Sequence, residues 1–382
     1  MKRGAFLGIV GIICEYNPLH LGHKKQLDLL KAQGHDIVCL MSGNFVQRGA
    51  PAIFDKMSRA EAALHCGADL VLELPVTAAL SSAEGFAAEG VRILSHFCDA
   101  LCFGGETGDK DTLLRLAAAL LSPEFPERLR TELDKGISFP VARAAALEAM
   151  GLNAAPLLTP NNILAVEYCK AILDQNSPMI PMPILREGSY HDTLPDPENP
   201  SATALRAMMP LGPWLDYIPR EAHDALSAGT IHTLAAGERA MLCKLRTMAD
   251  AEFEVLPYGS EGLWHKLMRA ARNETALEAV ATAVKSKRYT RTRIDRMILC
   301  AFLGINAADI ATPAPYARAL AFNDRGREIL KAGRERFDTP NIGEKQEHPY
   351  QLIEDRCDAL YGLFAADQIE SPTPKYRVRY VP

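Results

Sequence analysis

The chain has 382 residues, of which 48% are hydrophobic and 23% are charged, and its formal net charge is −5. This length predicts two or three domains, and the composition is typical of a globular protein rather than a disordered or fibrous one. The negative net charge excludes a global positive field, so any nucleic-acid contact must come from a local basic patch.

The cysteines and apolar runs exclude further classes of protein. The nine cysteines are scattered without a C-x-x-C pair, which argues against a disulfide framework and a ribbon-type zinc site, so no metal site is expected. No apolar run reaches the roughly 18 residues that a membrane span needs. Lys2, Arg3 and the apolar Ala5–Cys14 look like a signal peptide, but no small-residue cleavage site follows. We therefore predict a buried strand there, and a cytoplasmic protein.

The first part of the chain alternates between β-rich apolar runs and helical patterns. Strands are predicted over Leu7–Cys14, Asp36–Met41, Leu70–Leu74 and Ala100–Phe103. Helices are predicted from near Leu21 and over Ser58–Cys66 and Glu84–His96. This alternation indicates a mostly parallel sheet, in which the ligand lies beyond the carboxyl ends of the strands. Three polar segments follow predicted strands: Glu15 to His23, Ser42 to Arg48, and Gly104 to Glu106.

The rest of the chain is rich in helical patterns. Asp111–Met150 is predicted to be helix-rich, Ile163–Leu173 a helix and Met179–Leu185 a last strand. After about Gly212, amphipathic helices are predicted over Ala235–Ala249, Leu263–Arg272, Ala276–Ser286 and Arg291–Leu303, followed by a loosely held extended tail over Pro372–Pro382. We predict an α/β fold, with a Rossmann-like parallel-sheet domain over residues 1–210 and a mostly α-helical domain over residues 211–382.

The motif His20-Leu21-Gly22-His23 follows the first predicted strand and opens the first predicted helix. At a helix N-terminus, two imidazoles and the free N–H groups can all face a phosphate, and Gly22 lets a nucleotide approach. The imidazoles can stabilise a pentavalent α-phosphate while pyrophosphate leaves. Two surface histidines are the alternative for so short a pattern, but its position favours catalytic roles for His20 and His23.

A second segment, Ser201 to Arg206, resembles the Ser-x-Thr-x-x-Arg signature that closes H-x-G-H nucleotidyltransferase domains. Ser201 is a suitable N-cap, and the hydroxyls, the helix N-terminus and the Arg206 guanidinium together make a phosphate clamp. An ordinary capped helix is the alternative for this segment taken alone. The pairing of the two motifs predicts a nucleotidyltransferase domain.

With these motifs the chain resembles the tRNA(Met) cytidine acetate ligase family, an H-x-G-H nucleotidyltransferase-like group. The resemblance extends over nearly the whole chain, in the segments Gly11–His23, Met41–Gly49, Asp69–Pro75, Phe103–Glu106, Pro160–Leu164, Arg186–His191, Ser201–Arg206, Arg288–Arg293 and Phe322–Glu328. Leu19 and Leu21 depart from the aromatic residue and the asparagine of the family pattern, and neither change affects the histidines.

The resemblance implies an ATP-dependent ligase that activates acetate as acetyl-adenylate and acetylates N4 of the wobble cytidine of elongator tRNA(Met). Acetyl-CoA is not the donor, and Mg²⁺ is expected with the ATP, without a dedicated protein cage. The implied ATP contacts, together with the phosphate clamp, are Ile12, Ile13, Cys14, Glu15, Tyr16, Asn17, Pro18, Leu19, His20, Leu21, Gly22, His23, a glycine of Gly104-Gly105, an asparagine of Asn161-Asn162, Arg186, Ser201, Thr203 and Arg206.

The densest basic run lies in the second half of the chain. Its members are Lys285, Lys287, Arg288, Tyr289, Arg291, Arg293 and Arg296. Basic groups around an aromatic ring suit a phosphate backbone and an unstacked base, although such a run alone more often marks a solvated helix face. The family resemblance favours tRNA binding here. It is expected to extend over Arg325, Arg327, Lys331, Arg334 and Arg336.

Roles in the second step are open at this stage. Glu15 and His191 are candidates for the general base. Asn44, Gln47 and Arg48 are candidates to face the acid or the flipped cytidine, with a surface turn as the alternative.

Two other functions stay open from the sequence. A free-standing nucleotidyltransferase of cofactor synthesis, which joins AMP or CMP to a small phosphorylated molecule, shares both phosphate motifs but does not need a helical basic half. A non-catalytic RNA-binding protein with a degenerate nucleotide domain is disfavoured by the intact His20, Gly22, His23 and Arg206.

Overall fold

The computed structural model describes residues 8–185, 196, 199–209 and 211–382. Within these ranges, seven strands form one sheet in the order β7-β6-β1-β2-β5-β8-β9. Their bounds are Ile9–Cys14 (β1), Asp36–Ser42 (β2), Leu70–Leu74 (β5), Ala100–Gly105 (β6), Ile180–Leu185 (β7), Ala319–Phe322 (β8) and Arg379–Tyr380 (β9). The strands β7, β6, β1, β2 and β5 are parallel, which confirms the predicted α/β class. A separate hairpin consists of Phe45–Val46 (β3) and Ala50–Pro51 (β4).

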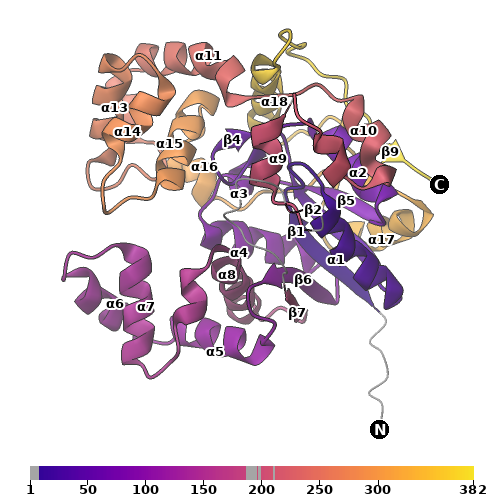
Figure 1. Ribbon diagram of the computed structural model, residues 1–382, viewed down its shortest axis with the longest axis horizontal. Coiled ribbons are helices and arrows are strands. Elements are labelled where there is room, and N and C mark those ends of the chain that lie inside the picture. Colours follow the sequence, from indigo (N-terminus) through magenta and orange to yellow (C-terminus); the bar gives the residue numbers. More distant parts are fainter. Residues whose placement is uncertain (1–7, 186–195, 197–198, 210) are drawn as a thin grey trace.

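Helices cover both faces of this sheet (Figure 1). The helices up to residue 209 are α1 (Leu21–Ala32), α2 (Lys56–His65), α3 (Val76–Ala79), α4 (Ala83–Leu94), α5 (Lys110–Leu120), α6 (Phe125–Leu133), α7 (Phe139–Ala149), α8 (Pro160–Asp174) and α9 (Ala202–Met208). The helices α1 and α2 share one buried core with the sheet, and α4, α5 and α8 share the other. Short 3-10 turns lie at Ala155–Leu158, Trp214–Tyr217, Arg220–Ala222 and Gly362–Phe364.

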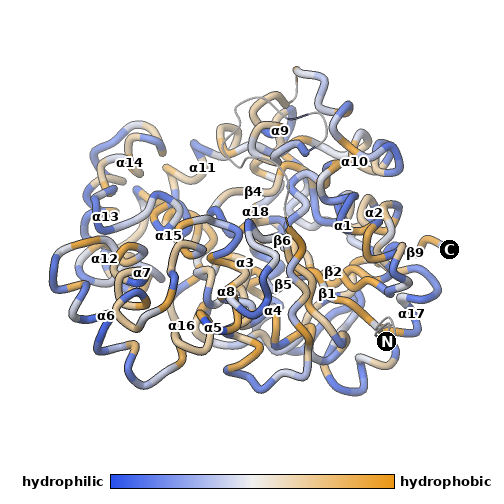
Figure 2. The backbone as a smooth tube through the Cα atoms, turned by 60° about the horizontal axis from the view of Figure 1, so that its bottom comes forward, coloured by the Kyte–Doolittle hydropathy of each residue, from blue (hydrophilic) through white to orange (hydrophobic). Residues whose placement is uncertain are grey.

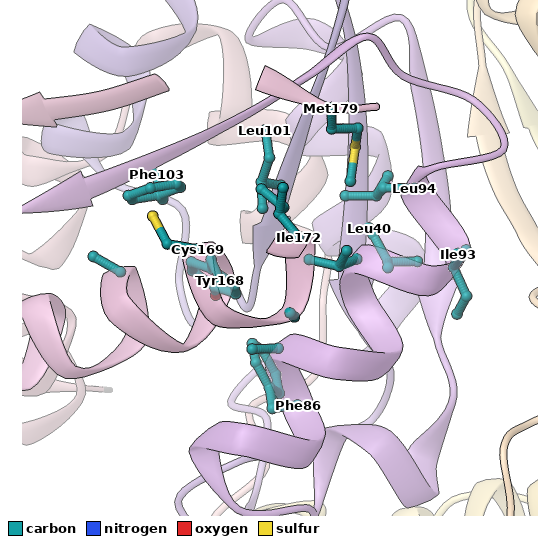
Figure 3. Close-up of a cluster of buried hydrophobic side chains, with 14 of the residues drawn as sticks. Leu40, Phe86, Ile93, Leu94, Leu101, Phe103, Tyr168, Cys169, Ile172 and Met179 are labelled. Carbon is teal, nitrogen blue, oxygen red and sulfur yellow. The ribbon is translucent and has the colours of Figure 1, made fainter. Parts of the chain in front are cut away.

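The strand β2 shows why the sheet is apolar on both sides. Its side chains alternate, so that Cys39 and Met41 join the core under α1 and α2, while Leu40 joins the core under α4 and α8. Figure 3 shows the second core, where Leu40 and other strand residues meet Phe86 of α4 and Ile172 of α8. The hydropathy colouring in Figure 2 places the apolar strands at the centre and the polar helices outside.

Capping residues set the helix starts. The Asp55 carboxylate accepts hydrogen bonds from the N–H groups of Met57 (2.8 Å) and Ser58 (3.1 Å), so α2 begins before the predicted Ser58. The predicted cap at Ser201 is confirmed, because its hydroxyl accepts the Ala204 N–H at 3.1 Å. The structure therefore places a helix N-terminus at each of the two sequence motifs, α1 and α9.

Four of the later helices, α11 and α13 to α15, form a cluster beside the sheet, at the upper left in Figure 1. The helices after residue 210 are α10 (His223–Ser227), α11 (Leu234–Thr247), α12 (Asp250–Glu254), α13 (Leu263–Asn273), α14 (Leu277–Val284), α15 (Arg291–Leu303), α16 (Ala307–Ala311), α17 (Asp324–Arg334) and α18 (Tyr350–Tyr361). Helices α11 to α15 pack with α18 around one core, which also takes Phe45 and Leu80 from the first half. In the part of the chain that the structure describes, no helix is long and apolar enough to cross a membrane.

Two strands of the second half differ from expectation. The strand β8 pairs antiparallel with β5, and β9 pairs parallel with β8 at the edge of the sheet. With four and two residues, they are too short to show a sequence period. The tail over Pro372–Pro382 is therefore held rather than loose: Val378 and Val381 pack on the core, and Asn44 Nδ2 donates to the Tyr376 hydroxyl at 3.1 Å. The expected boundary between residues 210 and 211 thus cuts across the sheet.

A buried charge cluster also joins the two halves. The fully buried Lys56 ammonium donates to Glu73 (3.0 Å) and to Asp358 of α18 (2.6 Å). Arg318 donates to Glu73 at 2.8 Å and lies 3.3 Å from Glu354. Buried charges are tolerated only when they are paired in this way, so α18 and the sheet depend on one another.

Candidate active site

A cavity of about 570 Å³ opens at the carboxyl ends of β1 and β6. From β1 the chain adds β2 and β5 on one side and then crosses back to add β6 and β7 on the other, so the cavity lies where the strand order reverses. Open parallel sheets bind ligands at this switch point, and the volume is within the usual range for small-molecule sites.

Most of the sequence-predicted ATP residues line this cavity. They are Ile12, Ile13, Cys14, Glu15, Tyr16, Asn17, His20, Gly22, His23, Gly104, Asn161, Ser201, Thr203 and Arg206. The residues of the predicted set that are not part of the wall are Pro18, Leu19, Leu21, Gly105 and Asn162. Arg186 and His191 lie outside the described residues. The two sequence motifs, far apart in the chain, therefore meet at one site.

The two histidines pack against each other at the start of α1. Their rings stack with centroids 3.7 Å apart, and the His20 N–H donates to His23 Nδ1 at 3.3 Å. Because His23 Nδ1 accepts this hydrogen bond, the proton of the neutral ring is on Nε2, which can donate to a ligand. A Cβ at Gly22 would lie 3.1 Å from His20 Cε1, so glycine leaves room for the stacked pair.

Arg206 connects α9 to the loop after β1. Its Nη1 donates to the Asn17 carbonyl at 2.6 Å and its Nη2 to the Thr203 hydroxyl at 3.2 Å. Burial and the nearby Arg48 lower the pKa of Arg206, and the nearby Glu15 opposes them. The partners in these hydrogen bonds are neutral, so the guanidinium is oriented while its positive charge stays available to a phosphate.

In each of the sequence pairs Gly104-Gly105 and Asn161-Asn162, the two residues have different roles. Asn162 Oδ1 accepts the Thr107 N–H at 3.1 Å and would lie 3.0 Å from a Cβ on Gly105. The second residues of the two pairs therefore shape the loop after β6. A Cβ on Gly104 would have no neighbour within 4 Å, so Gly104 borders open space in the cavity wall. The first member of each pair, Gly104 and Asn161, is the one that lines the cavity.

The carboxylate of Glu106 fixes the start of α8. It accepts hydrogen bonds from the Asn162 N–H at 2.8 Å and from Asn161 Nδ2 at 2.9 Å. Burial raises the pKa of Glu106, but hydrogen bonds from its own N–H, from the Thr159 side chain, and from Asn162 and Asn161 outweigh burial and hold the pKa below its ordinary value. The α8 N-terminus is thus occupied by a protein carboxylate.

Arg59 of α2, which is fully buried, is not among the residues predicted from the sequence. Its Nη1 donates to the carbonyls of Glu15 (2.6 Å) and Ser42 (3.0 Å), and Nη2 donates to the Gly43 carbonyl. One side chain therefore holds the loops after β1 and β2 in register. An arginine on an amphipathic helix ordinarily points to solvent, so the sequence gives no signal of this contact.

An apolar wall and some polar residues were also missed. They are Lys25, Gln26, Leu29, Phe86, Phe103, Leu164, Tyr168, Ile184, Leu185, Asn199, Pro200 and Ala202. The apolar members lie on helices and near strand ends, at positions that the sequence pattern assigns only to the core. Their exposure to the cavity depends on tertiary packing.

The β3–β4 hairpin brings two more predicted residues to the cavity. Gln47 and Arg48 line it, and the Gln47 N–H donates to Glu15 Oε1 at 2.8 Å. Arg296 of α15 donates to the Gln47 carbonyl at 3.1 Å, so the hairpin links the cavity to the helical cluster. Asn44 instead is buried, where its Nδ2 donates to Asp358 at 3.0 Å.

The predicted basic run lies around the start of α15, and its charges are partly neutralised. Arg291 donates to both carboxylate oxygens of Glu278 (2.7 Å each), and Arg288 donates to Glu261 at 2.9 Å. Tyr289 also donates to Glu261, and Arg293 stacks over the Tyr289 ring at 4.9 Å. Lys285 and Lys287 are exposed.

The residues that the structure describes contain no group of three or more histidine, cysteine, aspartate or glutamate side chains suited to a metal ion. The imidazoles and the guanidinium that line the cavity, with the N–H groups at the start of α1, suit phosphate recognition.

Comparisons with known proteins agree with this geometry. The family model described as HIGH Nucleotidyl Transferase matches residues 7–374. Two relatives named tRNA(Met) cytidine acetate ligase are 38% identical: that of Clostridium novyi covers 87% of this chain and 89% of its own length, and that of Alkaliphilus metalliredigens covers 87% of each.

Two crystal structures of Thermotoga maritima TmcAL are 30% identical to this chain and cover 98% of it. The apo form superposes with a TM-score of 0.88 over 99% of its own chain, and the form bound with alpha-thio ATP with a TM-score of 0.85 over 100%. The chain belongs to the tRNA(Met) cytidine acetate ligase family of the HIGH nucleotidyl transferases.

Proposed function

We propose that this protein is an ATP-dependent ligase that activates acetate as acetyl-adenylate and acetylates N4 of the wobble cytidine of elongator tRNA(Met). The observation that carries the proposal is the meeting of the stacked His20–His23 pair and Arg206 in one cavity at the switch point of the sheet. The relatives' name and the related structure with bound alpha-thio ATP support it. We expect this activity in the cytoplasm, where ATP and tRNA are both present.

In the first step, the cavity residues orient ATP for attack by acetate. His23 Nε2 and the free N–H groups of α1 face the α-phosphate, where negative charge develops as the carboxylate attacks in line. Arg206 and the start of α9 bind the phosphates that leave as pyrophosphate. If Mg²⁺ is bound with the ATP, it would neutralise part of the phosphate charge, and the phosphates and water would hold it. The cavity-lining members of the predicted ATP set other than Glu15 are the proposed contacts, and Arg186 adds a further one.

In the second step, the tRNA reaches the cavity from the side of the β3–β4 hairpin. The hairpin packs closely on α15. A Cβ added at Gly49 would lie only 2.5 Å from the Arg296 backbone nitrogen, so the two segments are in close contact there. The basic run is therefore connected to Gln47 and Arg48 in the cavity wall. The proposed tRNA contacts are Lys285, Lys287, Arg288, Tyr289, Arg291 and Arg293.

A nucleotidyltransferase of cofactor synthesis is the second candidate, because it uses the same phosphate motifs. It does not explain the link between the cavity and the helical cluster through the hairpin. The named relatives, which match over most of their length, also favour the ligase.

The test is to incubate the purified protein with ATP, Mg²⁺, labelled acetate and unmodified tRNA, and to analyse the nucleosides by mass spectrometry. We expect labelled N4-acetylcytidine that requires both ATP and acetate. Transfer of AMP to a small phosphorylated acceptor, with no acetylated nucleoside, would assign the protein to cofactor synthesis instead.

A further inference from the structure

Glu15 is the only aspartate or glutamate among the described residues that line the cavity. The site is otherwise suited to anions, since His20, His23, Arg48 and Arg206 face it. A carboxylate there opposes the binding of ATP and acetate, which both carry negative charge. The first step of the proposed reaction therefore does not explain why a carboxylate lies in this wall.

The structure holds Glu15 in a fixed position from two sides. Its Oε1 accepts the Gln47 N–H at 2.8 Å, and its carbonyl accepts from the fully buried Arg59 at 2.6 Å. Among the described residues, no hydrogen bond to the second carboxylate oxygen is present. One oxygen thus anchors the side chain, and the other is available to a substrate on the hairpin side of the cavity.

Other groups in the wall are poorly suited to accept a proton. Burial raises the pKa of Cys14, Tyr16 and Tyr168, so these groups keep their protons at neutral pH. The guanidinium groups of Arg48 and Arg206 are cationic, and the proposed reaction engages the histidines with phosphate. This leaves the carboxylate beside the proposed tRNA entrance.

We propose, building on the proposed ligase function, that Glu15 accepts the proton from N4 of the cytidine in the second step. N4 attacks the carbonyl carbon of the acetyl-adenylate and an N–C bond forms. The bond from this carbon to the phosphate oxygen breaks, and AMP leaves with that electron pair. One N4 proton passes to the Glu15 carboxylate, which returns it to solvent.

The substitution Glu15→Gln separates this role from a structural one, because the amide oxygen can still accept the Gln47 N–H. We expect the acetyl transfer to tRNA to fall by about 10²–10⁴-fold, the usual range for loss of a general base. Acetate-dependent ATP–pyrophosphate exchange, which does not involve N4, should fall far less. Thermal unfolding checks that the variant is folded, and Glu15→Asp, which keeps a carboxylate, serves as the second variant.

Each outcome separates the two proposals. Transfer by E15Q at the wild-type rate, or equal losses of exchange and transfer, overturns the role of Glu15 while the ligase function stands. A wild-type protein with neither exchange nor transfer overturns both.

The pH profile of transfer provides a second measurement. The titratable and charged groups that interact with Glu15 or share its cavity wall belong to several elements. They are Cys14 and Tyr16 next to it in the chain, Arg59 on α2, Arg48 on the hairpin, His20 at the N-cap of α1, His23 and Lys25 on α1, Tyr168 on α8 and Arg206 on α9. E15Q and E15D keep all of them. We expect the pH profile of transfer to have the same shape in the wild type and E15D, which both carry a carboxylate, and a different shape in E15Q. An identical profile in E15Q would contradict the proposal.

Discussion

The starts of α1 and α15 both carry residues that the sequence assigns to phosphate binding, but the structure uses their charges differently. In the cavity at the start of α1, Arg206 of α9 donates to a carbonyl and a hydroxyl, so it is oriented without losing its charge. At α15, Arg291 and Arg288 donate to carboxylates, which cancel much of theirs. A neutral partner prepares a cation for a ligand, whereas an acidic partner commits it to the fold.

The largest effect is expected from His23 in the cavity at the start of α1. His23→Ala removes a donor aimed at the developing charge on the α-phosphate, and should lower acetate-dependent ATP–pyrophosphate exchange by about 10²–10³-fold. His65→Ala, at an exposed position in the last turn of α2, is the matched control and should exchange like the wild type. Exchange by H23A at the wild-type rate would show that the phosphate chemistry takes place elsewhere. The contrast between the starts of α1 and α15 would then no longer hold.

A smaller effect is expected from Gly22→Ala. The added Cβ would lie 3.1 Å from His20 Cε1 and would displace the stacked rings by a few tenths of an ångström. Because small misplacements of catalytic groups are costly, we expect about a tenfold loss of exchange. The stability of the variant, measured by thermal unfolding, should change little. Full exchange activity in G22A would show that the ring stacking is not needed.

The next prediction tests the α15 side. The double variant Lys285→Ala/Lys287→Ala should raise the KM for tRNA severalfold and reduce its salt dependence, because phosphate contacts release counterions. Arg291→Ala should change the KM less and instead lower stability by about 0.5–1 kcal/mol, since its charge is used in ion pairs. Kinetics at several salt concentrations and urea unfolding measure both. A larger increase in the KM for tRNA in R291A than in the lysine variant would show that the ion pairs of Arg291 do not neutralise its charge toward tRNA.

The last prediction concerns stability, in the buried charge cluster. Burial raises the pKa of Glu354 to about 7, although Arg318 opposes it. The folded state therefore holds this proton up to about pH 7, whereas the unfolded chain releases it near pH 4.3. The free energy of unfolding should then fall as the pH rises through this window. Glu354→Gln should flatten that fall in urea unfolding at pH 5, 6 and 7. An equally steep fall in the variant would assign it to other groups.

The sequence predicts those parts of the site that depend on local rules. The strand β1, the start of α1 and the Ser201 cap lie where the patterns indicate, because strands, glycines and N-caps act over a few residues. Arg59 could not be assigned, since its partners are carbonyls of two distant loops. The neutralisation of the basic run was hidden for the same reason: Glu261 and Glu278 lie outside it.

The fold was predictable in its parallel part and not at its far edge. The strands β8 and β9 are too short for a periodic signal, and only pairing with β5 makes them strands. The helical pattern of α11 to α15 was clear, but its core with Phe45 and Leu80 connects it to the first half in a way that no local pattern reveals.

The pairing of Lys56 with Asp358 also has a consequence during synthesis. A nascent chain that contains the sheet but not yet α18 holds a lysine whose final partner is 302 residues away. Its ammonium must stay hydrated or rely on Glu73 alone, because an unpaired buried charge is strongly destabilising. The nucleotide-binding half should therefore stay loosely packed, and open to chaperones and proteases, until translation has supplied α18.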